Sequence, residues 1–174
     1  METFRFCPAC GGRLAPQSLR AGDPERLVCG RCGFVFYLDP KVAVGTIVGD
    51  GEGRVLLIRR AIEPGYGRWV FPGGYVDRGE PVEAAARREA LEECGLVVTL
   101  TGLVDVYSYP GSIPVVLVYA ATCVSGDVRL DEEGLEARWF APSDVPWEEL
   151  AFRSTAEGLR DYLTGRLHRP RIAD

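Results

Sequence analysis

The stretch GGYVDRGEPVEAAARREALEECGL, residues 73–96, decides how the rest of the chain is interpreted. Three glycines within its first seven residues interrupt regular structure and predict a loop. Pro81 lacks an amide hydrogen and suits the first turn of a helix. Residues 82–94 are mostly Ala, Glu, Arg and Leu, which are strong helix formers. We therefore expect a glycine-rich loop that leads into one helix, which ends in a left-handed cap at Gly95.

The expected helix carries an unusual set of charges on one face. Glu89, Glu92 and Glu93 fall at positions i, i+3 and i+4, so their carboxylates lie on the same side. These carboxylates repel one another, and hard divalent cations such as Mg²⁺ or Mn²⁺ take oxygen ligands of this kind. Arg88 is an i, i+4 partner of Glu92, and Glu80 lies just before the helix, where the helix dipole favours an anion. For an isolated pair of glutamates, a solvated acidic face would be the simpler interpretation.

The glycine and charged residues of this stretch follow a fixed spacing, with five, seven, two and one residues between successive members: Gly74, Glu80, Arg88-Glu89, Glu92-Glu93 and Gly95-Leu96. This spacing resembles the signature box of the Nudix hydrolases, which hydrolyse a nucleoside diphosphate linked to another moiety. The one departure is Ala90, where the family more often has a bulkier aliphatic residue, and it alters packing rather than chemistry. The resemblance implies an α/β protein, with a Nudix α/β/α sandwich and a mixed β-sheet over residues 39–174.

The resemblance also implies roles for the residues of the box. The expected Mg²⁺ ligands are three carboxylates and one backbone carbonyl: Glu89, Glu92, Glu93 and either Gly73 or Gly74. Glu80 is expected to support the metal ligands, and Arg88 to orient a carboxylate. In some relatives the general base comes from an acidic loop, where Glu133 and Glu136 are the candidates here, and in others it comes from the box helix. The sequence leaves both sources open.

Substrate contacts are expected from the chain around the start of the box. Arg59 and Arg60 either contact phosphate or simply end a solvated strand, and the residues alone do not separate the two interpretations. Tyr66 lies in a glycine-rich loop and is a candidate for stacking on a base. Gly74 completes the expected substrate-binding set.

Four of the six cysteines form two pairs ahead of the box, Cys7-x2-Cys10 and Cys29-x2-Cys32, with eighteen residues between the pairs. This spacing is typical of a zinc site rather than of disulfides. Residues 1–38 are therefore expected to form a small zinc ribbon with four thiolate ligands. So short a segment buries little apolar surface, and its stability has to come from the metal.

Composition narrows the range of partners. The 174 residues carry a formal charge of −5 and are 47 % hydrophobic, so the chain can fill a core but is not built as a general polyanion binder. The ribbon lacks a dense basic stripe, so we expect a small-molecule nucleotide as partner and not nucleic acid. The first residues show no secretory signal, and the longest apolar run, residues 115–121, is far too short to span a bilayer. We therefore expect a cytoplasmic protein with no membrane partner.

Apolar patterning and turn signals predict the remaining elements. The domain boundary is expected at Asp39-Pro40. Strands are expected at residues 42–48, 55–58, 97–100, 103–107, 115–122 and 136–140. A closing helix is expected to begin with a capping box formed by Ser154 and Glu157.

The expected substrate follows from a narrower resemblance. The ribbon and segments such as LLIRRAIEP, residues 56–64, resemble a Nudix subgroup that includes ADP-ribose and FAD pyrophosphatases. The NADH pyrophosphatases carry SQPWPFP after the box, whereas residues 105–114 here read DVYSYPGSIP. The resemblance therefore favours ADP-ribose or FAD, cut to AMP and a second monophosphate. The alternatives are a nucleoside triphosphate pyrophosphohydrolase and a non-catalytic nucleotide-sensing regulator. Many family members are dimers, which makes a homodimer compatible with the resemblance.

Overall fold

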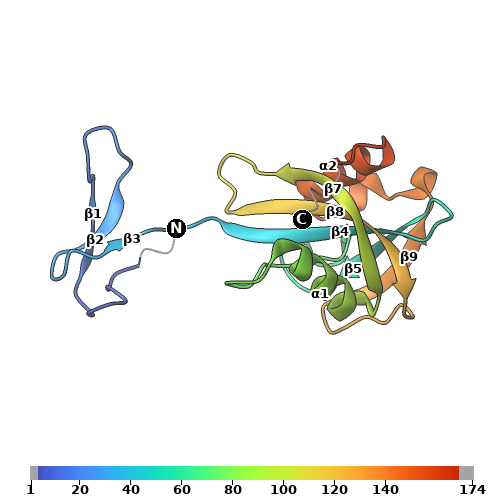
Figure 1. Ribbon diagram of the computed structural model, residues 1–174, viewed down its shortest axis with the longest axis horizontal. Helices are drawn as coiled ribbons and strands as arrows, with labels where there is room; N and C mark the ends of the chain where they lie inside the picture. The colour runs from blue at the N-terminus through green and yellow to red at the C-terminus, as the bar shows by residue number, and fades with distance from the viewer. Residues whose placement is uncertain (1–3, 169–174) are drawn as a thin grey trace, which may run out of the picture. The chain divides into compact units, whose positions relative to one another are not determined.

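The structure is a computed structural model that describes residues 4–168 (Figure 1). The chain divides into two compact units, Met1–Asp39 and Pro40–Asp174. Within the described part of the chain, the helices are all too short or too polar to cross a membrane.

The first unit is a three-stranded antiparallel sheet in the order β1-β2-β3 (Figure 1). Its strands are short: β1 Leu14–Gln17, β2 Arg26–Cys29 and β3 Val35–Phe36. Among residues 4–39, the buried members of the hydrophobic class are Cys7 and Cys29. The unit is thus organised around sulfur rather than around hydrocarbon, as expected for a zinc ribbon.

The second unit is built on a six-stranded mixed sheet in the order β6-β5-β4-β8-β7, with β9 paired to β5. Its strands are β4 Lys41–Gly49, β5 Val55–Arg60, β6 Trp69–Val70, β7 Val97–Tyr107, β8 Pro114–Ser125 and β9 Gly134–Phe140. The central strands β4 and β8 run parallel over nine residue pairs, while the other pairings are antiparallel. The expected mixed sheet is confirmed.

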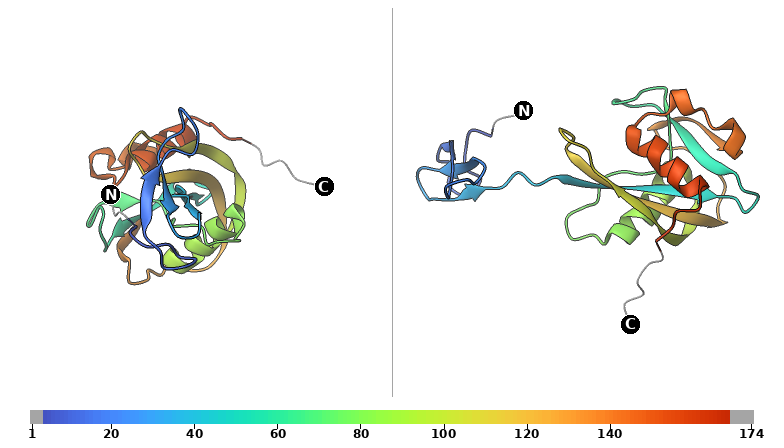
Figure 2. Two further views of the ribbon diagram at one scale, coloured as in Figure 1. Left: turned by 90° about the vertical axis from the view of Figure 1, so that its left-hand side faces the viewer. Right: turned by 90° about the horizontal axis from the view of Figure 1, so that it is seen from above.

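Helices cover both faces of this sheet (Figure 2). They are α1 Val82–Cys94 and α2 Arg153–Leu163, with short 3-10 turns at Pro142–Asp144 and Trp147–Glu149. Successive residues of a strand point to opposite faces. Val48 of β4 packs in one cluster with Ala90 of α1, whereas its neighbour Ile47 packs in another with Leu159 of α2. The second unit is therefore the expected α/β/α sandwich.

Local signals predicted the box helix closely. The helix α1 spans the expected residues 82–94, and Gly95 closes it in the left-handed conformation with φ 71°. One strand prediction was wrong, because residues 97–100 and 103–107 belong to the single strand β7. Irregularities in the pairing of β7 with β8, around Gly102, take the place of the expected break.

The predicted capping box of the last helix was also wrong. The helix α2 begins at Arg153, its cap residue is Phe152, and no side chain caps it. Ser154 lies inside the first turn and is only 9 % exposed. Glu157 instead accepts hydrogen bonds from the Tyr109 hydroxyl and the Arg153 guanidinium, each at 2.8 Å. Burial of this turn against the sheet thus overrides the local capping preference of serine.

Candidate active site

The loop of the box is fixed to the edge of β4 by backbone hydrogen bonds. The N–H of Thr46 donates to the carbonyl of Pro72 at 2.8 Å, and the N–H of Val44 donates to the carbonyl of Gly74 at 2.9 Å. These two carbonyls flank that of Gly73 and are both occupied. Because the Gly74 carbonyl already accepts a hydrogen bond, the Gly73 carbonyl is the freer of the two expected backbone ligands.

Both glycines at the start of the box are required by close approaches. A Cβ at Gly73 would lie 2.2 Å from the carbonyl oxygen of Val44, and a Cβ at Gly74 would lie 2.6 Å from the Glu89 carboxylate. At Gly73 the obstacle is the backbone of β4, which cannot move aside, whereas at Gly74 a side chain would force the Glu89 carboxylate out of its position. Because glycine has no side chain, the loop can approach β4 on one side and α1 on the other. It therefore lies directly over the acidic face of the helix.

Arg88 joins three of the box carboxylates. Its Nε and Nη2 donate to the two oxygens of Glu80 at 2.8 Å each, and its Nη1 donates to Glu89 at 2.8 Å and to Glu92 at 2.9 Å. Nη2 also donates to the carbonyl of Tyr75 at 3.2 Å. The paired guanidinium lowers the pKa of Glu80 to about 2. The predicted role of Arg88, orienting a carboxylate, is consistent with these contacts.

Glu93 is the least solvated carboxylate of the box. It lies partly buried and accepts a hydrogen bond from the N–H of Gly73 at 2.8 Å. Burial raises its pKa to about 8, and the negative charges of Glu89, Asp131 and Glu133 act in the same direction. Burial likewise raises the pKa of Glu89, against the opposing effect of Arg88. The site therefore holds negative charge that its own arginine does not neutralise.

The donor set of the box suits a divalent cation. Three carboxylates bind one guanidinium, a fourth carboxylate on the same helix binds the N–H of Gly73, and carboxylate oxygens are the ligands that Mg²⁺ prefers. In this structure the oxygens of Glu89 and Glu92 turn toward Arg88. Among the potential metal ligands in residues 4–168, it is the four cysteines whose ligand atoms already lie close to one another. A cation at the box would therefore share these carboxylates with Arg88.

The acidic loop before β9 lies close enough to the box for its charges to act on Glu93. Asp131 folds the loop by accepting a hydrogen bond from the N–H of Glu133 at 2.9 Å. The carbonyl of Glu133 accepts a hydrogen bond from the N–H of Ala61 at 2.7 Å, which ties the loop to the end of β5. Glu133 is thus brought toward the box, and its role as the general base stays a prediction.

Glu136, the other candidate, lies in β9 and has different neighbours. It accepts a hydrogen bond from the guanidinium of Arg138, and its carboxylate lies 4.0 Å from Nη1 of Arg59. The next residue of β9, Ala137, packs in the same cluster as Ala90 of α1, so the alternation of a strand puts Glu136 on the opposite face of the sheet. Glu136 is therefore held by arginines on the sheet rather than beside the box helix, and its catalytic role stays a prediction.

The predicted substrate-binding arginines both support the loop that carries Tyr66. Arg59 Nε donates to the carbonyl of Gly67 at 2.8 Å, and Arg60 Nε donates to the carbonyl of Pro64 at 2.9 Å. Tyr66 itself is 58 % exposed. The arginines are thus more than the end of a solvated strand, and phosphate contact by them and stacking by Tyr66 remain predictions.

The sequence analysis missed two residues at this site. Tyr75 follows Gly74 directly and has an exposed ring, and the ammonium of Lys41 lies 4.5 Å from the centre of that ring. Asp131 was missed as well, although the structure shows that it folds the acidic loop. The sequence offered one signal for Tyr75: its partner Lys41 is the only lysine in a chain whose other basic residues, histidine aside, are arginines.

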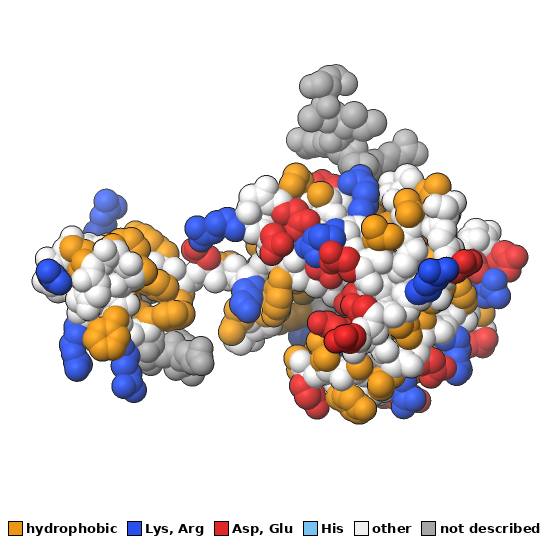
Figure 3. Space-filling view, turned by 90° about the horizontal axis from the view of Figure 1, so that it is seen from below, with side chains coloured by type: hydrophobic (Ala, Val, Ile, Leu, Met, Phe, Trp, Pro, Cys, Tyr) orange, Lys and Arg blue, Asp and Glu red, His pale blue; other side chains and the backbone are white. Residues whose placement is uncertain are grey.

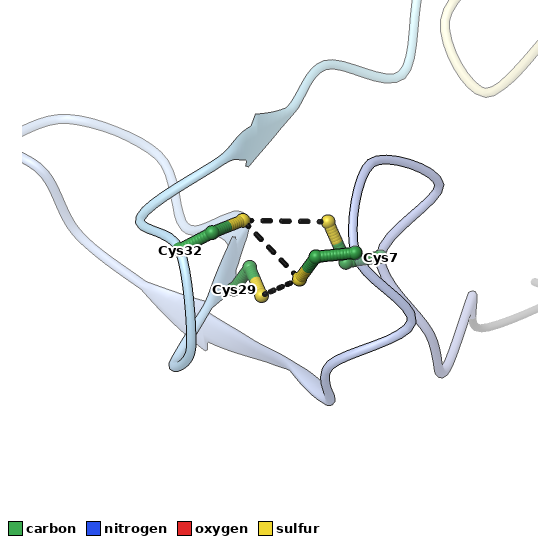
Figure 4. A group of neighbouring side chains, drawn as sticks. Cys7, Cys29 and Cys32 are labelled. Carbon is green, nitrogen blue, oxygen red and sulfur yellow. Dashed lines mark hydrogen bonds between the residues drawn. The ribbon is translucent and has the colours of Figure 1, made fainter.

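The first unit brings its four cysteines together. Their Sγ atoms all lie within 4.8 Å of one another, and three of the contacts are drawn in Figure 4. They come from two turns that face each other: Cys7, Cys10, Cys29 and Cys32. Hydrogen bonds from the N–H groups of Cys32 and Arg31 lower the pKa of Cys29 to about 6, which favours the thiolate that zinc binds. The quartet therefore has the composition and convergence of a structural zinc site.

Comparisons with known families match both units. A family model described as "NUDIX domain" matches residues 39–162, and one described as "Nudix N-terminal", a zinc ribbon, matches residues 5–38. Among solved structures, a Nudix hydrolase from Nitrosomonas europaea has a TM-score of 0.87 and 35 % identity, and the match covers 94 % of this chain and 92 % of that one.

Two kinds of relative are also similar in sequence. An ADP-ribose pyrophosphatase from Methanocaldococcus jannaschii is 34 % identical, over 75 % of this chain and 77 % of the relative. An NAD-capped RNA hydrolase from Pseudomonas aeruginosa is 32 % identical, over 93 % of this chain and 56 % of the relative. The chain thus spans about half the length of the NAD-capped RNA hydrolases that it matches.

Proposed function

Because this chain belongs to the Nudix family, we propose that it is a pyrophosphatase that cuts ADP-ribose or FAD into AMP and a second monophosphate. The observation that carries the proposal is the acidic cluster of the box, in which Arg88 ties three carboxylates together beside the partly buried Glu93. The similarity to an ADP-ribose pyrophosphatase over three quarters of the chain supports the choice of substrate.

The box would hold Mg²⁺ or Mn²⁺ through three carboxylates and one carbonyl: Glu89, Glu92, Glu93 and Gly73. When bound, such a cation screens the phosphate charges and makes a nearby water more acidic. Arg88 would orient the carboxylates of Glu89 and Glu92. Glu80 would in turn fix the guanidinium of Arg88, because both of its oxygens accept hydrogen bonds from it. We assign the backbone ligand of the cation to the carbonyl of Gly73, because the carbonyl of Gly74 already accepts a hydrogen bond from the N–H of Val44.

Proton transfer from the attacking water requires a base near the box. Glu133 is our first candidate, since its loop is tied to β5 and its charge acts on Glu93. Glu136 is the second candidate, and the box helix itself is the third source. On the substrate side, Tyr66 would stack on the base, with Arg59, Arg60 and Gly74 lining the phosphate path.

The experiment is a panel of substrates with Mg²⁺ and identification of the products by mass. The panel holds ADP-ribose, FAD, NADH, an NAD-capped RNA and a nucleoside triphosphate. AMP with ribose phosphate or with FMN supports the proposal and ranks the two substrates. Pyrophosphate from the triphosphate alone would identify a triphosphate pyrophosphohydrolase instead. Tight binding of ADP-ribose with no product would identify a nucleotide-sensing regulator, and preference for the capped RNA would move the activity toward that of the second group of relatives.

A further inference from the structure

The guanidinium of Arg88 uses all five of its N–H groups within the box. Nε and Nη2 donate to the two oxygens of Glu80, and Nη2 also donates to the carbonyl of Tyr75. Nη1 donates to two of the proposed cation ligands, Glu89 and Glu92. One side of the guanidinium is thus anchored to groups that are not proposed ligands, while the other side binds the ligands themselves.

The anchor keeps the guanidinium of Arg88 in place. Its side chain is only 30 % exposed, and Glu80 is held in turn by the N–H of Asp77, which donates to its Oε2 at 3.1 Å. Moving the guanidinium away from the box would break three hydrogen bonds to groups that are not proposed ligands, two of them to a charged carboxylate. The positive charge of Arg88 therefore stays beside Glu89 and Glu92 whatever else these carboxylates bind.

Two of the three proposed carboxylate ligands have a constraint that is independent of Arg88. Glu93 accepts a hydrogen bond from the N–H of Gly73 at 2.8 Å. The side chain of Glu89 is 12 % exposed and lies against Gly74, where a Cβ would approach its carboxylate to 2.6 Å. Without Arg88, these two carboxylates would keep their places, and the site would lose a positive charge.

Glu92 is the ligand at which Arg88 and a cation meet most directly. Its side chain is 56 % exposed, and within the described residues its hydrogen-bond partner is Nη1 of Arg88. Figure 3 views the second unit from the side of α1 and shows acidic side chains gathered beside a basic one. A cation that takes Glu92 as a ligand therefore encounters the charge of Arg88 on the same carboxylate.

We propose that Arg88 competes with the divalent cation and keeps the affinity of the box for Mg²⁺ or Mn²⁺ low. The inference rests on the proposed function, which supplies the cation ligands. Two positive charges on the same carboxylates repel each other, so each weakens the binding of the other. The box then loads in proportion to the free cation concentration instead of staying filled, and that concentration can regulate the rate.

The competition has a sign that separates it from a purely orienting role. If Arg88 only oriented the ligands, its loss would disorder them and weaken cation binding. Competition predicts that loss of the guanidinium strengthens cation binding. Because a hydrogen bond to a charged group contributes about tenfold or more to an equilibrium constant, removal of the two Nη1 bonds should strengthen binding about tenfold or more.

The test is a titration of the zinc-loaded chain with Mn²⁺ at neutral pH without substrate, in which electron paramagnetic resonance measures the free ion. Arg88→Met removes the guanidinium and keeps much of the apolar length, and the dissociation constant for Mn²⁺ should fall about tenfold or more. Zinc content and urea unfolding followed by tryptophan fluorescence check that each variant is folded.

Arg87→Met is the matched control. Arg87 is the preceding residue of α1, is exposed, and donates to the carbonyl of Glu83 at 3.1 Å. The substitution removes the same charge from the same helix without removing a hydrogen bond to a box carboxylate. Because an exposed charge is screened by salt, the dissociation constant for Mn²⁺ should change about twofold or less.

A second measurement uses the wild type and does not depend on the folding of a variant. Coupling between two binding events is reciprocal, so Mg²⁺ must also weaken the hydrogen bonds from Nη1. In nuclear magnetic resonance, the Nη1 hydrogens of Arg88 should exchange with water faster when Mg²⁺ is added. The Nε hydrogen, which is bound to Glu80, should stay protected.

Weaker or unchanged Mn²⁺ binding by folded Arg88→Met would overturn the proposal. An equal gain in Arg87→Met, or Nη1 exchange that Mg²⁺ does not accelerate, would overturn it as well. A failure of the proposed function would look different. Binding that strengthens as predicted, in a chain that cuts neither ADP-ribose nor FAD, would leave the competition standing and refute the substrates. If all the Mn²⁺ stayed free in both proteins, the cation site and the competition would be refuted together.

Discussion

The raised pKa of Glu93 predicts how the metal-free protein responds to pH. Its folded-state pKa is about 8 because of burial, against an ordinary value of 4.5. Between these two pH values the folded state holds a proton that the unfolded state releases, so the free energy of unfolding falls as pH rises. At 1.36 kcal/mol per pKa unit, the loss by pH 9 amounts to at most about 5 kcal/mol.

Glu93→Gln should remove this loss. The amide oxygen can still accept the N–H of Gly73, and the side chain no longer ionises. Without Mg²⁺, the variant and the wild type should be similarly stable at pH 5, and the variant should be more stable at pH 9 by several kcal/mol, up to about 5. Urea unfolding followed by tryptophan fluorescence measures this directly, since all three tryptophans lie in the second unit. The exposed Glu148→Gln is the matched control.

The sign of the change is what tests the reasoning. The difference in stability, wild type minus Glu93→Gln, should become more negative from pH 5 to pH 9. If it became more positive instead, the surroundings would have to stabilise the ionised carboxylate, and the reasoning would be wrong. Added Mg²⁺ at pH 9 should restore stability to the wild type and have little effect on the variant. The Mg²⁺-free buffer should be prepared with a chelating resin before protein is added, so that zinc stays in the ribbon.

Three further predictions follow from single side chains. Glu92→Gln keeps the shape of a proposed Mg²⁺ ligand and removes its charge, so kcat should fall about a hundredfold or more, and near-normal turnover would exclude the role. Gly74→Ala places a Cβ 2.6 Å from the Glu89 carboxylate, so the Mg²⁺ concentration needed for half-maximal rate should rise about tenfold, whereas an unchanged metal requirement would show that the loop yields freely. Cys32→Ser should abolish stoichiometric zinc in metal analysis, and full zinc content in that variant would contradict the four-thiolate site.

The parts of the fold that sequence predicted are those set by local chemistry. The box helix was bounded correctly because Pro81 before it and the left-handed Gly95 after it act within one turn. The cysteine quartet was predicted by spacing, since each pair is confined to a single turn. The same local reasoning failed at Ser154, where burial against the sheet decides the start of the helix.

The parts that sequence left open depend on pairings between distant segments. Arg88 reaches Glu80, eight residues away, because the glycine loop folds back over the helix, and no helical spacing predicts that contact. The choice between Glu133 and Glu136 depends on how β9 lies against β5, which places Glu136 opposite Arg59. Asp131 lies in the loop before β9, and its charge comes near Glu93 only in the folded chain.

The central claim is that the box hydrolyses the P–O–P bridge of ADP-ribose or FAD. The most direct measurement is the mass of the products from ADP-ribose with Mg²⁺ in water enriched in heavy oxygen. We predict AMP and ribose phosphate, with one heavy oxygen on the phosphate of one of them, and no product in Glu92→Gln. Intact ADP-ribose and intact FAD in the presence of Mg²⁺ and folded wild-type protein would contradict the claim.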